Sequence, residues 1–353
     1  MRMDVDGSLA SMPERAYTDE KPYTERLCGS VGGRMSRQGL SSYSISRGML
    51  EFGMISQPGN ALKRSYMIKG FLFLLPATLV YLFFAVIPFF DNLVLSFQDW
   101  NGFSARVFAG FDNYLESFRD ANFLLAIKNS IYLGVVSSII SVVVGVLLAW
   151  LLLFVGKRSG GIFRTILFSP SMIPAVITAL IFSFVYEPEI GVLNQLLKVL
   201  NLGNLQTAWL TNRSTVLNSI LFVSVWKQIG LTMVLCFAGM QAISPSLLES
   251  ARLEGAGDWA ILRKIILPLI MSFVQLSAIF ALMSGLKIYD TVLALTNGGP
   301  GKFSVVMPMW IMQNAFSFNR YGYGAAMSVI FVLIVLAGML LTKCLIKGDS
   351  YEL

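Results

Sequence analysis

Histidine is absent from this 353-residue chain, and charged residues make up only 13% of it. The lack of histidine excludes catalytic sites built on Ser–His or Cys–His pairs and metal sites built on imidazole. A soluble domain carries about a quarter charged residues, so the shortage of charge argues for a membrane protein. The net charge of +7 fits basic flanks beside acidic lipid headgroups and calls for no nucleic acid partner.

A nucleotide-binding loop is also missing, because the pattern Gly-x-x-x-x-Gly-Lys-Ser/Thr occurs nowhere in the chain. The nearest imitation, residues 298–304, has the wrong spacing and places Pro300 where a backbone N–H donor is needed. Three cysteines, Cys28, Cys236 and Cys344, show no metal-binding spacing and fall outside any outward loop, so we expect no disulfide and no metal. We therefore expect a chain without enzymatic activity and without a cofactor of its own.

Long apolar runs are what the chain has in abundance. Five runs are uncharged and a sixth is interrupted only by Lys227; they cover residues 70–90, 129–156, 165–186, 216–242, 265–286 and 321–342. Each is long enough, at about 1.5 Å per residue, to cross a hydrocarbon core of about 30 Å. Because no water is available there to satisfy the backbone, each must be a helix. The sequence predicts an all-α, polytopic membrane protein with six transmembrane helices.

Lys and Arg are densest before the first run, in the loops after the second and fourth runs, and after the sixth. This distribution predicts that both termini face the cytoplasm. We place the six-helix domain at residues 63–348, between an N-terminal tail of residues 1–62 and a C-terminal tail of residues 349–353. The N-terminal tail is rich in Ser, Gly and Arg and lacks a signal peptide's apolar core, so we expect it to be disordered and cytoplasmic. We also hypothesise that translation begins at Met49 or Met54.

The cytoplasmic loop between the fourth and fifth runs is the most informative segment. Helix formers on both sides of a glycine centre predict two short helices joined by a turn, in which Gly255 and Gly257 permit a positive φ or a close approach. Pro268 is expected to open the next span, where its missing N–H costs least. One apolar face is expected from Ala251, Leu253, Ala256 and Trp259. The simpler alternative is an amphipathic linker at the membrane surface.

The residue order of this loop resembles the EAA loop of the membrane subunits of ATP-binding cassette (ABC) importers. The order matches the family motif at Glu249, Ala251, Gly255, Ala256, Ile265, Leu267 and Pro268, and the predicted coupling loop also includes Ser250, Glu254 and Gly257. It departs from the family at Ser250, where Ala is usual, and at Glu254, where Asp is usual. In that family the loop plugs into the ATPase, so the resemblance implies that residues 249–268 couple this chain to one.

A second resemblance lies in residues 285–290, Gly-Leu-Lys-Ile-Tyr-Asp, and 295–300, Leu-Thr-Asn-Gly-Gly-Pro. These are similar to the first permease of maltose-type and glycerol-3-phosphate-type importers. The resemblance implies the type I importer permease fold, a bacterial inner-membrane location and a sugar or sugar-like cargo. It also implies three partners: a second homologous permease, an ABC ATPase dimer that carries the ATP and Mg, and an extracytoplasmic solute-binding protein.

Cargo contacts are harder to assign. The candidates are the polar and aromatic residues of the inner helices, namely Lys227, Gln228, Gln275, Ser277, Tyr289 and Asp290. A lysine at a helix centre costs about 2.5–3.5 kcal/mol, so Lys227 either lines a cavity or extends its stem to the outer headgroups. The other candidates could instead tie helices together. A rival function, ion-coupled secondary transport, would need several ionisable residues in the membrane, and no carboxylate lies within any of the six runs.

Overall fold

The computed structural model describes residues 60–346, with the side chains of residues 60–68, 157 and 158 left out. Cys28, the candidate start methionines and both predicted tails, except residues 60–62, lie outside the described residues. The chain divides into two units, Met1–Phe73 and Leu74–Leu353. The first unit contributes only the beginning of helix α1, which starts at Asn60, three residues before the predicted boundary.

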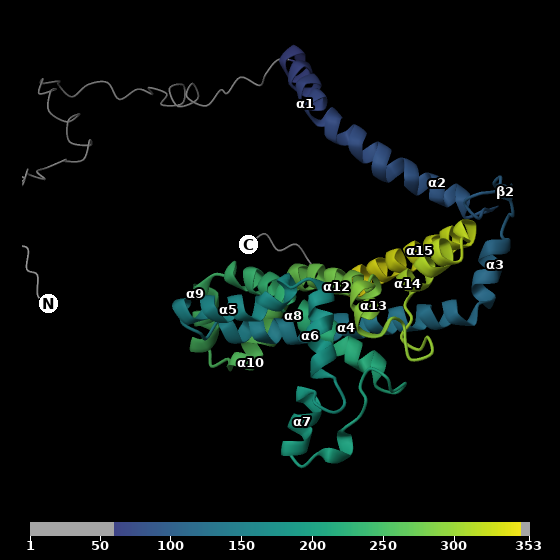
Figure 1. Ribbon diagram of the computed structural model, residues 1–353. Helices are drawn as coiled ribbons and strands as arrows, with labels where there is room; N and C mark the ends of the chain where they lie inside the picture. The colour runs from purple at the N-terminus through teal and green to yellow at the C-terminus, as the bar shows by residue number, and fades with distance from the viewer. Residues whose placement is uncertain (1–59, 347–353) are drawn as a thin grey trace, which may run out of the picture. The chain divides into compact units, whose positions relative to one another are not determined.

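Helices make up almost all of the described chain (Figure 1). In order, the elements are α1 (Asn60–Tyr81), the π-helical turn η1 (Leu82–Val86), α2 (Ile87–Leu95), β1 (Gln98–Asp99), β2 (Val107–Phe108), α3 (Asp112–Arg119), α4 (Ala121–Leu152), α5 (Lys157–Met172), α6 (Ala175–Val185), α7 (Val192–Val199), the 3₁₀ turn η2 (Gly203–Leu205), α8 (Val216–Gln241), α9 (Pro245–Leu253), α10 (Asp258–Ile261), the π-helical turn η3 (Leu262–Ile266), α11 (Leu267–Leu269), α12 (Met271–Leu286), α13 (Asp290–Thr296), α14 (Met307–Met312), the π-helical turn η4 (Gln313–Ser317) and α15 (Tyr321–Leu345).

Four of the six predicted spans are single helices, at Lys69–Leu95, Ala121–Leu152, Val216–Gln241 and Tyr321–Leu345. The third and fifth are broken: Ser159–Met172 meets Ala175–Val185 at 98°, and Asp258–Leu269 meets Met271–Leu286 at 76°. The count of six is therefore confirmed if each bent pair is one span. The expectation of a straight helix was wrong for these two. The first span also runs past Asp91 to Leu95, so it does contain a carboxylate.

Prolines explain the first break and two widened turns. Pro174 forces Ile173 into an extended conformation (ψ 129°), which ends α5. In the π-helical turns, the N–H of Ile87 bonds to Leu82 and that of Leu267 to Leu262, five residues back. Ile87 is followed by Pro88 and Leu267 by Pro268. In a regular α-helix each proline ring would clash with the carbonyl four residues earlier, and the wider π-helical turn makes room for the ring.

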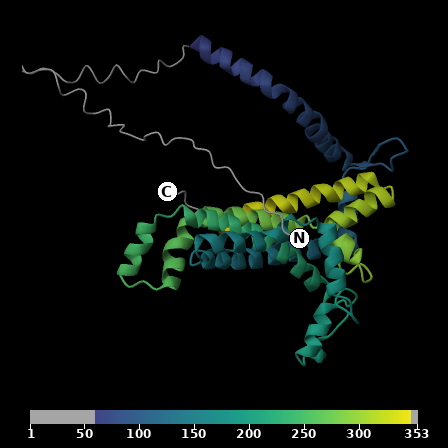
Figure 2. The same cartoon turned by 60° about the vertical axis from the view of Figure 1, so that its left-hand side comes forward.

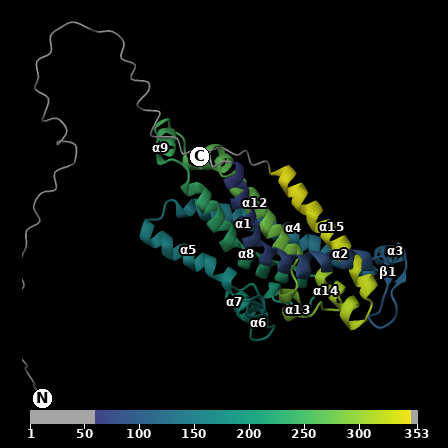
Figure 3. The ribbon, with the colours of Figure 1, turned by 90° about the horizontal axis from the view of Figure 1, so that it is seen from above.

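The spans α4, α8, α12 and α15 run alongside one another and hold the core (Figure 3). Small residues allow α4 and α12 to approach closely, where a Cβ on Gly285 would meet Ser137 Oγ and the Cα of Gly134. One buried cluster, which includes Phe123, Val216 and Met307, fills the half of the bundle that carries α13 and α14. A second cluster, built on α4, α8 and the α10–α11 segment, fills the other half.

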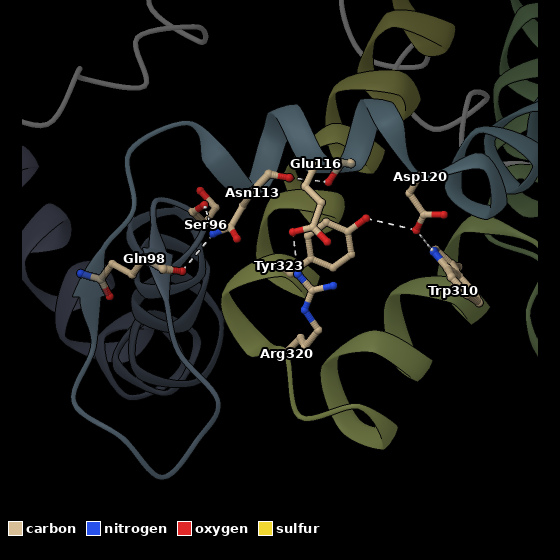
Figure 4. A network of polar contacts seen from close by, with 9 residues as sticks. Ser96, Gln98, Asn113, Glu116, Asp120, Trp310, Arg320 and Tyr323 are labelled. Atoms are coloured by element: carbon tan, nitrogen blue, oxygen red, sulfur yellow. Dashed lines mark hydrogen bonds and ion pairs between the residues drawn. The ribbon is translucent and has the colours of Figure 1, made fainter.

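A polar network joins α3, α4 and α15 at the end opposite α9 (Figure 4). Asp120 caps α4 by accepting from the backbone N–H of Asn122 (2.8 Å), and its other oxygen accepts from Trp310 Nε1 (2.8 Å) and Tyr323 OH (3.1 Å). Asn113 Nδ2 donates to the carbonyls of Ser96 (3.1 Å) and Gln98 (2.9 Å). These bonds fix the chain that leaves the first span against the rest of the bundle.

Candidate functional site

The loop at 249–268 is two helices joined by a glycine turn, and it lies at one end of the bundle (Figures 1 and 2). Helix α9 ends in a Schellman turn: the N–H of Ala256 bonds to Ala251 (3.0 Å) and that of Gly255 to Arg252 (3.0 Å). Gly255 takes φ +86°, a conformation that L side chains rarely adopt. The prediction of two short helices around a glycine turn is confirmed.

The glycine turn depends on Gly255 alone. Gly257 has φ −69°, and nothing lies within 4 Å of a Cβ added to it, so it needs neither a positive φ nor a close approach. The expectation for Gly257 was wrong in both respects. Pro268 lies in the first turn of the short helix α11, but α11 continues the helical segment Asp258–Leu269, so Pro268 does not open the fifth span as expected.

The predicted apolar face of the loop is split between two environments. Ala251 is buried and Ala256 half-buried, and both pack into the cluster formed by α4, α8 and α11. In contrast, Leu253 is 90% exposed and Trp259 60% exposed, so the single four-residue face was wrong. The loop is thus anchored by its alanines, while a leucine and a tryptophan face outward.

Polar residues surround the exposed side of the loop. Glu249, Ser250, Glu254 and the two glycines are exposed. Arg252 Nη2 lies 3.4 Å from Asp258 Oδ1, an ion pair that connects α9 to α10 across the turn. Because both partners are more than half exposed, this pair contributes about 0.2–1 kcal/mol at most. The Schellman turn and the buried alanines therefore hold the loop's shape.

Two cavities of about 290 and 280 Å³ lie beside α8 and α12. Lys227, Gln228 and Ser284 line both. Tyr289 and Asp290 line the first cavity, together with Lys287. Ser277 lines the second cavity, so five of the six predicted cargo residues lie around the two cavities. Gln228 Oε1 is buried there without a hydrogen-bond partner within the described part of the chain.

Lys227 forms a hydrogen bond with the backbone at the bend in the third span. Its Nζ donates to the carbonyl oxygen of Ile173 at 2.8 Å, and the residue is half-buried. A lysine has three N–H donors, so two remain for the cavities. Of the two alternatives left open by the sequence, this geometry favours cavity lining over a stem extended to the headgroups.

Gln275, the remaining cargo candidate, lines neither cavity. Its Nε2 donates to the carbonyls of Lys343 (3.2 Å) and Ile346, which caps the C-terminal end of α15. A helix tie was the alternative for such residues, and the contacts of Gln275 match it.

The sequence reasoning missed several cavity residues on one face of α12. They are Phe280 and Ser284, followed by Lys287, and they share this face with the predicted candidate Ser277. These positions are three to four residues apart, the spacing of one helix face, so this periodic stripe of polar and aromatic residues was the signal available. Within residues 60–346 there is no group of three or more His, Cys, Asp or Glu side chains that could hold a metal.

A family profile described as "Binding-protein-dependent transport system inner membrane component" matches residues 141–348, more than half of the chain. The chain belongs to this family. It is therefore a permease subunit of an ABC importer and a multi-pass protein of the bacterial inner membrane, as the resemblance implied.

The permease is 37% identical over 288 residues to the probable ABC transporter permease protein YurN of Bacillus subtilis (81% of this chain, 98% of that protein). It is 31% identical to the diacetylchitobiose uptake system permease protein NgcF of Streptomyces coelicolor, over 73% of this chain and 76% of that protein. A crystal structure of a bacterial ABC transporter involved in the import of alginate matches with a TM-score of 0.70 at 23% identity, covering 82% of this chain and 98% of that one. This likeness confirms the type I importer permease fold.

Proposed function

We propose that this permease, paired with a second homologous permease, forms the pathway of an importer for sugars or sugar-like solutes. An extracytoplasmic binding protein delivers the cargo, and a separate ABC ATPase dimer, with its ATP and Mg, supplies the energy. Relatives named for sugar uptake, such as NgcF, support the cargo class. Both termini and the 249–268 loop face the cytoplasm in this proposal, and no covalent chemistry occurs on the chain.

The cargo passes the two cavities beside α8 and α12. Each is close to the lower limit, about 300 Å³, of typical ligand pockets, and each is bounded here by residues of one chain only. A second permease facing this side would complete them. The lining offers hydroxyl, amide and amino groups and the Tyr289 ring, which suit a polyhydroxylated ligand.

The loop at 249–268 is the coupling element, and the observation that carries this assignment is its division into two sides. Ala251 and Ala256 bind it to the bundle, while Leu253 and Trp259 are exposed beside the acidic residues Glu249 and Glu254. A large exposed apolar pair on a rigid element fits a protein partner. Coupling requires that the ATPase bind the loop with different affinity in the inward-open and outward-open states of the permease. Equal affinity for both states would not shift the equilibrium between them.

The coupling assignment is tested by purifying the tagged permease in mild detergent and identifying its partners by mass spectrometry. The wild type should bring an ATPase and a second permease. Gly255→Pro should lose only the ATPase, because proline fixes φ near −65° and cannot take the +86° that the turn requires. Gly257→Ala is the matched control and should retain every partner, since φ is −69° and the space is open.

Two outcomes would contradict the proposal. A Gly255→Pro variant that keeps its ATPase and its ATP-driven uptake would remove the loop from the coupling role. A wild type that purifies alone or as a homodimer would contradict the heteromeric importer. The cargo class is tested separately with the assembled complex in proteoliposomes, which should accumulate a labelled disaccharide and exclude a labelled amino acid.

A further inference from the structure

The hairpin that follows the first span presents apolar side chains to the outside. Its strands β1 and β2 pair antiparallel, with Gln98 opposite Phe108 and Asp99 opposite Val107. Phe103 is 89% exposed, Val107 62% and Phe108 76%. Nothing in the proposed transport function uses these residues.

The hairpin is well ordered, so this exposure is not that of a loose loop. Asn101 Oδ1 accepts from the backbone N–H groups of Phe103 (3.0 Å) and Ser104 (2.8 Å), and Trp100 Nε1 donates to the carbonyl of Ser104 (2.9 Å). The Trp100 ring packs against Tyr321 at a centroid distance of 5.3 Å. Three apolar side chains held outward by such bonds indicate a surface that is covered in the cell.

Arg106 fixes the level of the hairpin relative to the membrane. Its guanidinium pairs with Asp91 (Nη1 to Oδ1, 2.9 Å) and stacks over Trp100, 4.7 Å from the ring centroid. Asp91 lies in the first span, four residues before its end at Leu95 and so about 6 Å inside that end. The hairpin therefore folds back beside the last turn of the span and does not project away from it.

The side of the span next to this turn is itself unburied. None of its most apolar window is buried within the chain, and Phe89, Phe90 and Val94 are each about half exposed. Aromatic residues concentrate where a membrane meets water, and amphipathic elements sink about 5–10 Å into that boundary. The exposed hairpin residues therefore extend the apolar surface of the first span, and they do so at the depth where the membrane meets water.

We propose that residues 98–111 form an interfacial anchor that inserts Phe103, Val107 and Phe108 into the phospholipid boundary at the Leu95 end of the first span. Trp100 and Arg106 lie at the headgroup level, and the ion pair with Asp91 keeps the span's acidic residue neutralised there. This anchor requires only that the first span crosses the membrane, and neither the proposed cargo nor the coupling loop.

The test places a spin label at Phe103→Cys or Val107→Cys in the assembled complex. Cys28 and Cys344 are replaced by serine, and the complex is reconstituted in nanodiscs of phosphatidylethanolamine and phosphatidylglycerol. Collision with oxygen, which concentrates in lipid, is compared with collision with a water-soluble nickel chelate. Asn204→Cys, on an exposed 3₁₀ turn, is the control. Labels at 103 and 107 should favour oxygen, and the label at 204 should favour the nickel chelate.

Two results would overturn the anchor. The first is nickel access at 103 and 107 equal to that at 204. The second is loss of label mobility only when the binding protein is added to the reconstituted complex, which would assign the surface to that protein. Because Phe103 is almost fully exposed, its replacement removes little packing, and an unchanged thermal midpoint verifies that the labelled variant is folded.

Discussion

Replacing Lys227 with methionine has two opposite effects on the stability of the folded permease, and these effects partly cancel. The change removes the hydrogen bond from Nζ to Ile173 and leaves that carbonyl unpaired, which costs about 1–3 kcal/mol. It also removes a charge from the middle of a span, a gain of about 2.5–3.5 kcal/mol on the insertion scale. We therefore expect Lys227→Met to insert and assemble with a stability within about 2.5 kcal/mol of the wild type.

Uptake should respond much more strongly. A hydrogen bond to a charged group contributes about 1.5–3 kcal/mol, so loss of the amino group from the pathway should weaken cargo binding about ten- to hundredfold. The assay is the concentration dependence of uptake into proteoliposomes, with the thermal midpoint of the complex measured in parallel. Lys227→Arg keeps a donor and should retain most of the uptake. Lys287→Met removes a charge from the first cavity only and should have a smaller effect.

The reasoning is refuted if Lys227→Met takes up cargo with unchanged concentration dependence, since the amino group would then lie off the pathway. A large fall in the thermal midpoint with normal uptake by the surviving complex would show that Lys227 serves only the bend at Ile173.

Three further predictions concern the ends of the helices. Gly255→Ala should destabilise the loop by about 1–2 kcal/mol and speed hydrogen exchange at the Ala256 amide, while Gly257→Ala should leave it unchanged. Asp120→Ala should lower the thermal midpoint by the equivalent of at least about 2 kcal/mol, because it removes a helix cap and leaves the donors of Trp310 and Tyr323 unpaired. Gln275→Leu should lower the midpoint by the equivalent of about 1–3 kcal/mol yet leave the concentration dependence of uptake intact, because Gln275 caps α15 and lines neither cavity.

Much of the fold could be predicted from the sequence because hydropathy reports how many apolar residues follow one another. Hydropathy does not report whether the helix axis changes direction within a run, so the two bent spans were predicted as straight helices. The signal for the first bend was present in Pro174, since a proline restricts the residue before it. The second bend, at Ile270, has no such marker, and its backbone (φ −94°, ψ 10°) depends on packing between α8, α11 and α12.

The loop and the cavities likewise show that local features could be predicted from the sequence and long-range contacts could not. Local backbone chemistry decided the turn at Gly255, so the residue order was sufficient to predict it. The environments of Leu253 and Trp259 depend on which side of the loop meets α4 and α8, which no local pattern states. The sequence could not decide between the two roles of Gln275, because its partners lie at the end of α15 and just after it, 68 and 71 residues away in the chain.

The bent fifth span has a mechanical consequence. From Asp258 to Leu269 it is one unbroken helix, about 18 Å long, that runs from the exposed loop to the bend at Ile270. A displacement of about 2 Å at its loop end would rotate this arm by about 6° about the bend. Beyond the pivot, α12 carries Ser277, Phe280 and Ser284 into the cavities. A bend that keeps its 76° angle would pass this rotation on to α12, the helix that lines both cavities.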